Sequence, residues 1–299
     1  MKLSKNDSDL FFDLWFPLME YANMKYGIDT SIKRINRQTG INLTSAFKIA
    51  EKIWKDTSII DDYLAENELP EDEQKILKSW HYRIKGTFVI ERHLKKGAVI
   101  IDNEDNVYIV KGLTQSIRDL TCDFPTPVYI QGTLLPFKNV IITDGLIMPY
   151  NVIIGGNMRA ELKELYMEAK RNDWIIEKMN IDLLDENRHL LKFFRSDISN
   201  LSEKTIDNHM KIVQWYLCCY LANQDLRMQD GLNCLDDFFN REVSGSPNEI
   251  KKICTSIKKF YKSMAEHGRI SREDYKSLCS EIKENFPRWT EECNYNNIF

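Results

Sequence analysis

The sequence predicts an α+β protein, because helical and strand-like patterns occupy separate parts of the 299-residue chain. Apolar residues recur at helical spacing up to about Trp80 and again beyond Gly156, whereas the stretch between them consists of short β-branched and aromatic runs. We therefore expect an N-terminal helical region (1–85), a small β-domain (86–156), a helix with a linker (157–199) and a C-terminal helical domain (200–299).

The N-terminal region predicts three helices. The first contains the apolar face of LFFDLWFPLMEYANMKY, with Pro17 expected to kink it or to mark a new start and Gly27 to end it. A second helix is expected over 45–67. Pro70, followed by three acidic residues, predicts the start of a third helix that ends near Trp80.

The middle of the chain predicts five or six short strands, from the runs FVIE, AVIID, VYIVKG, PVYIQGTLL, NVIIT and NVIIG. We expect them to form a small antiparallel sheet, curled or barrel-like. The stretch Thr143-Asp144-Gly145-Leu146 predicts a tight hairpin turn, because Asp and Gly tolerate the positive φ angles of a type I′ turn.

Beyond Gly156 the pattern is helical to the end. Asn157 is expected to cap RAELKELYMEAKR, and the polar stretch 195–201 is interpreted as a linker. Four further helices are expected, in IDNHMKIVQWYLCCYLAN, over roughly 231–239, in EIKKICTSIKKFYKSMAEHG and in DYKSLCSEIKENF, the last of them ending at Pro287.

Composition excludes several classes of protein. The net charge of −4 is incompatible with a large uniform basic field. The seven cysteines and five histidines lack the spacing of a zinc site, so we expect no metal, no cofactor and no disulfide. We find neither a signal-peptide pattern nor an apolar run long enough to span a bilayer, and we expect a cytoplasmic protein without a membrane partner.

Lysines gather on one side of the helix expected over 249–268. With no acidic residue among them, they lie opposite the apolar stripe of that helix and comprise Lys251, Lys252, Lys258, Lys259 and Lys262. Such a face can lie along the phosphate backbone of nucleic acid, or it can simply be solvated.

The junction IIGGNMRAE is a weaker candidate for binding an anion. Gly155 and Gly156 would bring backbone N–H groups to a helix start, with Asn157 and Arg159 close by. The alternative is a glycine turn with Asn157 as the helix cap. We assign no catalytic residue, because GxGxxG, P-loop and GxSxG motifs are missing and the Glu-x-Lys pairs lie on predicted helices.

Two stretches resemble known families. Residues 202–285, from SEKTIDNHMKIVQWYL through SIKKFYKSMAEHGRIS, resemble the SAM-like core-binding domain of tyrosine recombinases. That resemblance implies a helical module that holds DNA. It implies no recombinase activity, because none of the five histidines has Arg at the third following position. Residues 1–180 resemble an uncharacterised group of bacterial proteins through LFFDLWFPLMEYAN, WHYRIKGTF, VYIVKGLTQSI and TLLPFKNVIITDGL.

Taken together, these patterns predict a non-catalytic bacterial protein. We expect its C-terminal helical domain to bind nucleic acid or a nucleoprotein partner. Two alternatives stay open: a protein–protein adaptor whose lysine face is solvated, and an enzyme with an unrecognised site in the β-domain.

Overall fold

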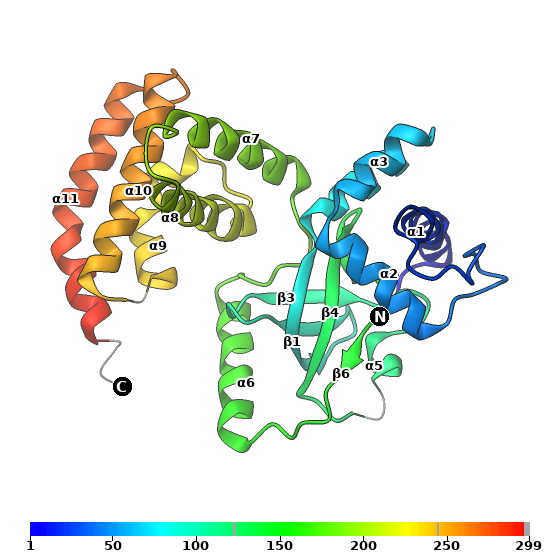
Figure 1. Ribbon diagram of the computed structural model, residues 1–299. Helices are drawn as coiled ribbons and strands as arrows, with labels where there is room; N and C mark the ends of the chain where they lie inside the picture. Colours follow the sequence, from blue (N-terminus) through cyan, green and yellow to red (C-terminus); the bar gives the residue numbers. More distant parts are fainter. Residues whose placement is uncertain (122–123, 244, 296–299) are drawn as a thin grey trace. The chain divides into compact units, whose positions relative to one another are not determined.

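The computed structural model describes residues 1–121, 124–243 and 245–295 (Figure 1). It divides the chain into two compact units, Met1–Met179 and Asn180–Phe299. Helices occupy both ends of the chain and a six-stranded mixed sheet lies between them in sequence, which confirms the α+β class. Among the described residues, no helix combines the length and the apolar character needed to cross a membrane.

The first unit begins with four helices, α1 (Lys5–Tyr26), α2 (Leu43–Lys55), α3 (Ser58–Glu66) and α4 (Glu71–Ser79), followed by the 3₁₀ turn η1 (Trp80–Tyr82). α1 continues through Pro17 as one helix and ends at Gly27, where φ is +59°. The single helix expected over 45–67 is wrong, because the chain leaves helical geometry at Asp56. The Asp56 carboxylate instead accepts a hydrogen bond from the backbone N–H of Ser58.

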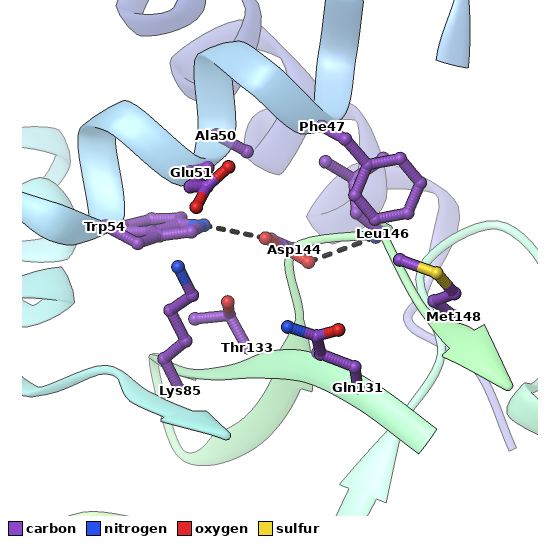
Figure 2. A pocket seen from close by; sticks show the side chains of 11 residues that line it. Phe47, Ala50, Glu51, Trp54, Lys85, Gln131, Thr133, Asp144, Leu146 and Met148 are labelled. Atoms are coloured by element: carbon purple, nitrogen blue, oxygen red, sulfur yellow. Dashed lines mark hydrogen bonds between the residues drawn. The ribbon is translucent and has the colours of Figure 1, made fainter. Parts of the chain in front are cut away.

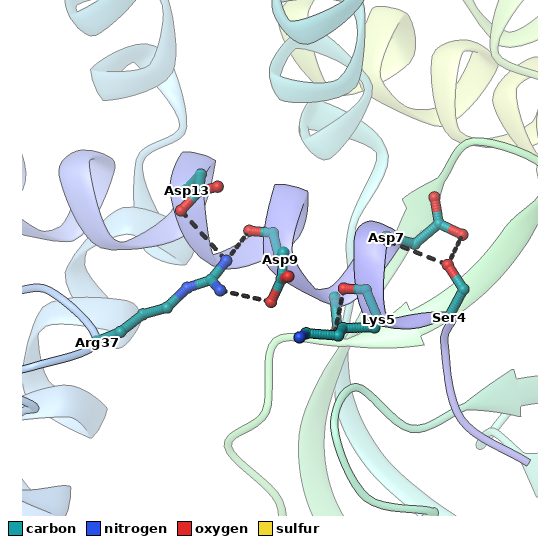
Figure 3. Close-up of polar contacts among 7 residues, drawn as sticks. Ser4, Lys5, Asp7, Asp9, Asp13 and Arg37 are labelled. Atoms are coloured by element: carbon teal, nitrogen blue, oxygen red, sulfur yellow. Dashed lines mark hydrogen bonds and ion pairs between the residues drawn. The ribbon is translucent and has the colours of Figure 1, made fainter.

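Polar contacts anchor α1 at its start and along its exposed side (Figure 3). The hydroxyl of Ser4 accepts a 3.1 Å hydrogen bond from the backbone N–H of Asp7 and caps the helix. Arg37, from the loop that follows α1, pairs with Asp9 and also with Asp13, at 3.2 Å. The long loop between α1 and α2 is thereby tied back onto α1.

The strands form a closed barrel with one additional strand. They are β1 (Ile84–His93), β2 (Ala98–Ile101), β3 (Val107–Lys111), β4 (Val128–Phe137), β5 (Val140–Thr143) and β6 (Met148–Pro149). The order is β1-β2-β3-β5-β4, and β1 also pairs with β4, which closes five strands into a ring while β6 adds to β4. This arrangement, with the short α5 (Ile117–Leu120) between β3 and β4, corresponds to the five-stranded OB barrel.

The sheet differs from the expected one in two respects. β3 and β5 pair in parallel, so the sheet is mixed rather than antiparallel throughout. The hairpin turn expected at 143–146 is wrong, because β5 and β6 both pair with β4 and not with each other. The tight turn lies instead between β4 and β5, where Lys138 has φ of +52°. The run NVIIG forms no strand.

β2, β3, β5 and the C-terminal half of β4 are buried on both faces, whereas the first half of β1 is partly exposed. Inward side chains such as Ile100, Ile130 and Ile141 fill the barrel. The outward side chains of β1–β3 pack against α6 (Gly156–Arg171), whereas those of β4 and β5 pack against the N-terminal helices. This two-sided burial explains why the strands appear in the sequence as continuous apolar runs.

The second unit is a helical bundle built around one central helix. Its main helices are α7 (Ile181–Asp197), α8 (Glu203–Gln214), α9 (Leu235–Glu242), α10 (Pro247–Glu266) and α11 (Arg272–Tyr295). α8 continues into the π-helix η2 (Trp215–Leu221), and the short 3₁₀ turns η3 (Ala222–Gln224) and η4 (Asp230–Asn233) follow. α10 buries ten side chains and contacts α7, α8 and α11.

The unit boundary lies near residue 180, not near 200 as expected from the sequence. α7 belongs to the second unit, because Leu190, Leu191 and Phe194 are part of its core. The polar stretch 195–201 is the end of α7 and the turn before α8, so the interpretation of it as an interdomain linker is wrong. Pro287 lies inside α11 and does not end it.

Candidate functional site

The five predicted lysines lie on the side of α10 opposite its buried stripe, here called the lysine face (Lys251, Lys252, Lys258, Lys259 and Lys262). Three of them are exposed and two are half-buried. The opposite side of the helix is fully buried through Ile257, Phe260 and Met264. Because that buried side fixes the rotation of α10, the bundle holds the lysine face toward solvent.

Polar contacts fix α10 against its neighbours beside the lysine face. Ser256 lies 2.8 Å from Nδ1 of His209 on α8, and Ser263 donates a 2.6 Å hydrogen bond to Asp197 on α7. Burial, and to a smaller extent the charge of Lys259, lower the pKa of His209. The imidazole is therefore neutral at neutral pH and adds no positive charge beside the lysine face.

The lysine face is largely without counter-ions. Lys262 lies 3.6 Å from Glu266, and both side chains are 59% exposed. The other four lysines form no ion pair with any residue that the structure describes. Hydrogen bonds from Ser246, helped by the charge of Lys252, lower the pKa of Glu249 at the start of the helix. The charges of Lys251, Lys258 and Lys259 are available to an anionic partner.

The predicted anion junction is a plain helix start. α6 begins at Gly156 with Gly155 as its cap residue, so the expectation that Asn157 caps this helix is wrong. Arg159 Nε donates a 2.9 Å hydrogen bond to the carbonyl of Ile154 and thus closes the preceding turn. Both glycines are exposed. One N–H group of the guanidinium is used by the turn, and we assign no site here.

A cavity of about 260 Å³ lies between α2 and the outer face of the barrel (Figure 2). Asp144, which directly follows β5, forms its base and is only 4% exposed. Its Oδ2 accepts a 2.7 Å hydrogen bond from Nε1 of Trp54, and its Oδ1 accepts a 3.0 Å bond from the backbone N–H of Leu146. The strand alternation of β5 places Asp144 on the same outer face as Ile142.

Burial raises the pKa of Asp144 to about 6. The hydrogen bonds from Leu146 and Trp54 lower it again, but they offset only part of the cost of burying the charge. A carboxyl group in this state is mostly ionised at neutral pH and becomes protonated in mildly acidic solution. Perturbed carboxyl groups in cavities are typical of functional sites.

Other polar groups surround the same cavity. Lys85 on β1 and Glu51 on α2 are exposed at its mouth, and Gln131 and Thr133 on β4 project toward it (Figure 2). Lys85 and Thr133 are register partners across β1 and β4, which places them next to each other. The remaining walls are mainly apolar, as in most small-molecule sites.

A second, smaller cavity of about 160 Å³ lies on the other side of the same segment. It is bordered by Asp144 and Leu146 as well, and by aromatic side chains of α1. The ring of Trp15, which lines this cavity, stacks on Trp54 with centroids 5.0 Å apart and planes 6° apart. Asp144 thus lies beside both cavities.

From the sequence alone, Asp144 is expected in a local turn, with no connection to α2. One signal was present: Phe47, Ala50, Glu51 and Trp54 recur at helical spacing and place a carboxylate among apolar residues on one helix face. No local pattern, however, indicated that this face lies over the end of β5.

The barrel surface that binds oligonucleotides in OB folds is covered in this protein. Outward side chains of β2 and β3, including Val99 and Ile109, pack against Leu162 and Tyr166 of α6. That surface is therefore part of a hydrophobic core. In the described part of the chain, no group of three or more His, Cys, Asp or Glu side chains is arranged to hold a metal ion.

Comparisons of the chain with protein-family models, with curated proteins and with solved structures find no match. The recombinase-type resemblance of residues 202–285 and the role of the lysine face consequently stay predictions.

Proposed function

We propose that the protein binds nucleic acid through the lysine face, which contacts the phosphate backbone. The observation that carries this proposal is that four of the five lysines on one side of α10 form no ion pair with any described residue. Neutralising phosphates with lysines releases condensed counter-ions, and this release drives most non-specific binding to nucleic acid.

The dimensions of α10 fit several phosphates in a row. With a rise of about 1.5 Å per residue, the segment from Lys251 to Lys262 is about 16 Å long. The expected binding is weak and independent of base sequence. The lysine face lacks the Arg, Asn and Gln side chains that form paired hydrogen bonds with base edges.

Fluorescence anisotropy with a labelled DNA duplex tests the proposal. If all five lysines contact phosphates, the slope of log affinity against log salt is about −4.5, which lowers affinity about 100-fold between 50 and 150 mM salt. Replacing Lys251, Lys258, Lys259 and Lys262 with Glu is expected to abolish binding while the helical content measured by circular dichroism stays unchanged.

A matched control carries the same charge change elsewhere. Lys33, Lys48, Lys55 and Lys95 are exposed residues of the first unit, and their replacement with Glu should leave DNA binding within about twofold of wild type. If the wild-type protein does not bind at low salt, or if both quadruple variants lose binding equally, the proposal is wrong. The lysine face is then solvated, as the adaptor alternative requires.

A further inference from the structure

We infer that the cavity above Asp144 binds a small organic cation, a primary ammonium group attached to an apolar body. This site lies in the first unit and is independent of the proposed contact between the lysine face of α10 and nucleic acid. The inference rests on the buried charge of Asp144, on the neutral character of its hydrogen-bond donors and on the walls of the cavity.

Asp144 is a buried carboxylate without a counter-ion. Among the residues that the structure describes, no Lys, Arg or His forms an ion pair with it. Buried charges in proteins are normally paired, because an isolated charge of this kind loses most of its hydration. Lys85 projects toward the cavity without pairing with Asp144, so the charge at the base of the cavity stays uncompensated.

The hydrogen-bond donors around the carboxylate are all neutral. Trp54 donates to Oδ2 and the backbone N–H of Leu146 to Oδ1. The hydroxyl of Thr133 and the backbone N–H of Asp144 itself are further donors. None of these groups carries a charge, whereas an ammonium group would supply the missing positive charge. Charge-assisted hydrogen bonds of this kind are about twice as strong as neutral ones.

The surroundings of Asp144 select against other ligands. An anion would meet the carboxylate at the base, while at the mouth the opposite charges of Glu51 and Lys85 offset each other. The walls formed by Phe47, Leu146 and Met148 suit an apolar body. The volume of about 260 Å³ is just below the usual range of about 300–1,000 Å³, which favours a small ligand.

Three compounds of similar shape test whether the site prefers a cationic, a neutral or an anionic ligand. Phenethylamine is the cationic probe, phenethyl alcohol the neutral one and hydrocinnamate the anionic one. The full-length protein is labelled with 5-fluorotryptophan, and the fluorine signal of Trp54 is assigned with Trp54→Phe. The amine should shift the Trp54 signal and bind at least about tenfold more tightly than the alcohol, whereas hydrocinnamate should not bind.

Substitutions then locate the binding site. Asp144→Asn should weaken binding of phenethylamine at least about tenfold, whereas Glu91→Gln, a change at another buried carboxylate of the barrel, should leave it unchanged. If Asp144→Asn fails to fold, the exposed mouth provides a second test. Glu51→Lys should weaken amine binding several-fold, and Glu68→Lys, an exposed control outside the cavity, should not.

Wild-type protein provides a test that needs no substitution. Phenethylamine stays protonated at pH 5 and pH 7, whereas Asp144, whose pKa is about 6, becomes mostly protonated at pH 5. The charged groups around it are Glu51 from α2 and Lys85 from β1; β4 contributes only Gln131 and Thr133, and the second cavity no further charge. Amine binding should be about tenfold weaker at pH 5 than at pH 7, with alcohol binding unchanged.

Three results would overturn the inference. They are equal affinity for the amine and the alcohol, no shift of the Trp54 signal at 10 mM amine, and undiminished amine binding in a folded Asp144→Asn variant. None of these results depends on whether α10 binds nucleic acid.

Discussion

The indole Nε1 of Trp54 donates a 2.7 Å hydrogen bond to Oδ2 of Asp144, a residue 90 positions later in the chain. This single contact joins α2 to the end of β5, and both groups are almost completely buried. The carbonyl of Trp54 in turn accepts hydrogen bonds from the guanidinium of Arg83, at 2.7 and 3.2 Å. Trp54 thus connects the C-terminal turn of α2, the start of the barrel and the base of the cavity.

Trp54→Phe should destabilise the first unit by about 1–3 kcal/mol beyond the effect of the altered packing, because it removes a donor from a buried carboxylate. Urea unfolding followed by fluorine signals of Trp15 and Trp80, both in the same core, provides the measurement. In an Asp144→Asn background the same substitution should lower the free energy of unfolding by less. Equal decreases in both backgrounds would mean that the hydrogen bond contributes no coupling energy.

Asp144 should make the stability of the first unit dependent on pH. Its pKa is about 6 in the folded protein, against an ordinary value of 3.8. Between these values the folded state binds more protons than the unfolded state, so stability falls as the pH rises through this window and levels off above it. From pH 4 to pH 7 the wild-type protein should lose about 2 kcal/mol relative to Asp144→Asn. Urea unfolding at both pH values measures this, and parallel pH profiles would contradict it.

A fragment that begins at Asn180 should fold, whereas one that begins at residue 200 should not fold stably. The shorter fragment lacks α7 and therefore leaves exposed the core surface that Leu190 and Phe194 cover. Removing such large buried side chains costs several kcal/mol in total. Thermal unfolding followed by circular dichroism should be cooperative for 180–299 and broad for 200–299. Two equally cooperative transitions would place the boundary near 200 after all.

Burial should protect two cysteines of the second unit from alkylation. It raises the pKa of Cys254 to about 12 and that of Cys218 to about 11. Because the thiolate is the reactive form, both should react slowly with iodoacetamide at neutral pH and rapidly after denaturation. Half-buried Cys279 provides a comparison within the same helical bundle. Mass spectrometry of the native protein over time measures the order of modification. If Cys254 or Cys218 were modified before Cys279, the prediction would be wrong.

Gly231→Ala should destabilise the second unit by about 1–3 kcal/mol. A methyl group at this position would lie 2.5–2.8 Å from side-chain atoms of Tyr261, Leu221 and Tyr216. Gly156→Ala is the matched control, since a methyl group there meets no atom within 4 Å. Urea unfolding should separate the two variants, and similar losses of stability would show that the core around Gly231 adapts.

Short-range patterns predicted a large part of the fold. The end of α1 at Gly27 and the start of α4 after Pro70 follow from local backbone preferences. The break at Asp56 was missed, because the apolar spacing continues across it. The side chain of Asp56 accepts a hydrogen bond from the backbone N–H of Ser58, and this bond competes with helical geometry. The parallel pairing of β3 with β5 also lay beyond prediction, since it depends on the path of the chain through α5 and β4.

The two candidate sites also differ in how much of each could be predicted from the sequence. The sequence by itself determined the lysine face, because helical periodicity alone places Lys251, Lys258 and Lys262 on one side of a helix whose other side is apolar. Only the tertiary structure decided that Asp144 is buried, that Trp54 is its donor and that a cavity lies above it. The physical reason is the separation along the chain of the residues that determine each site. A helix face repeats every few residues along the chain, whereas the environment of a buried carboxylate is set by whichever distant element packs over it.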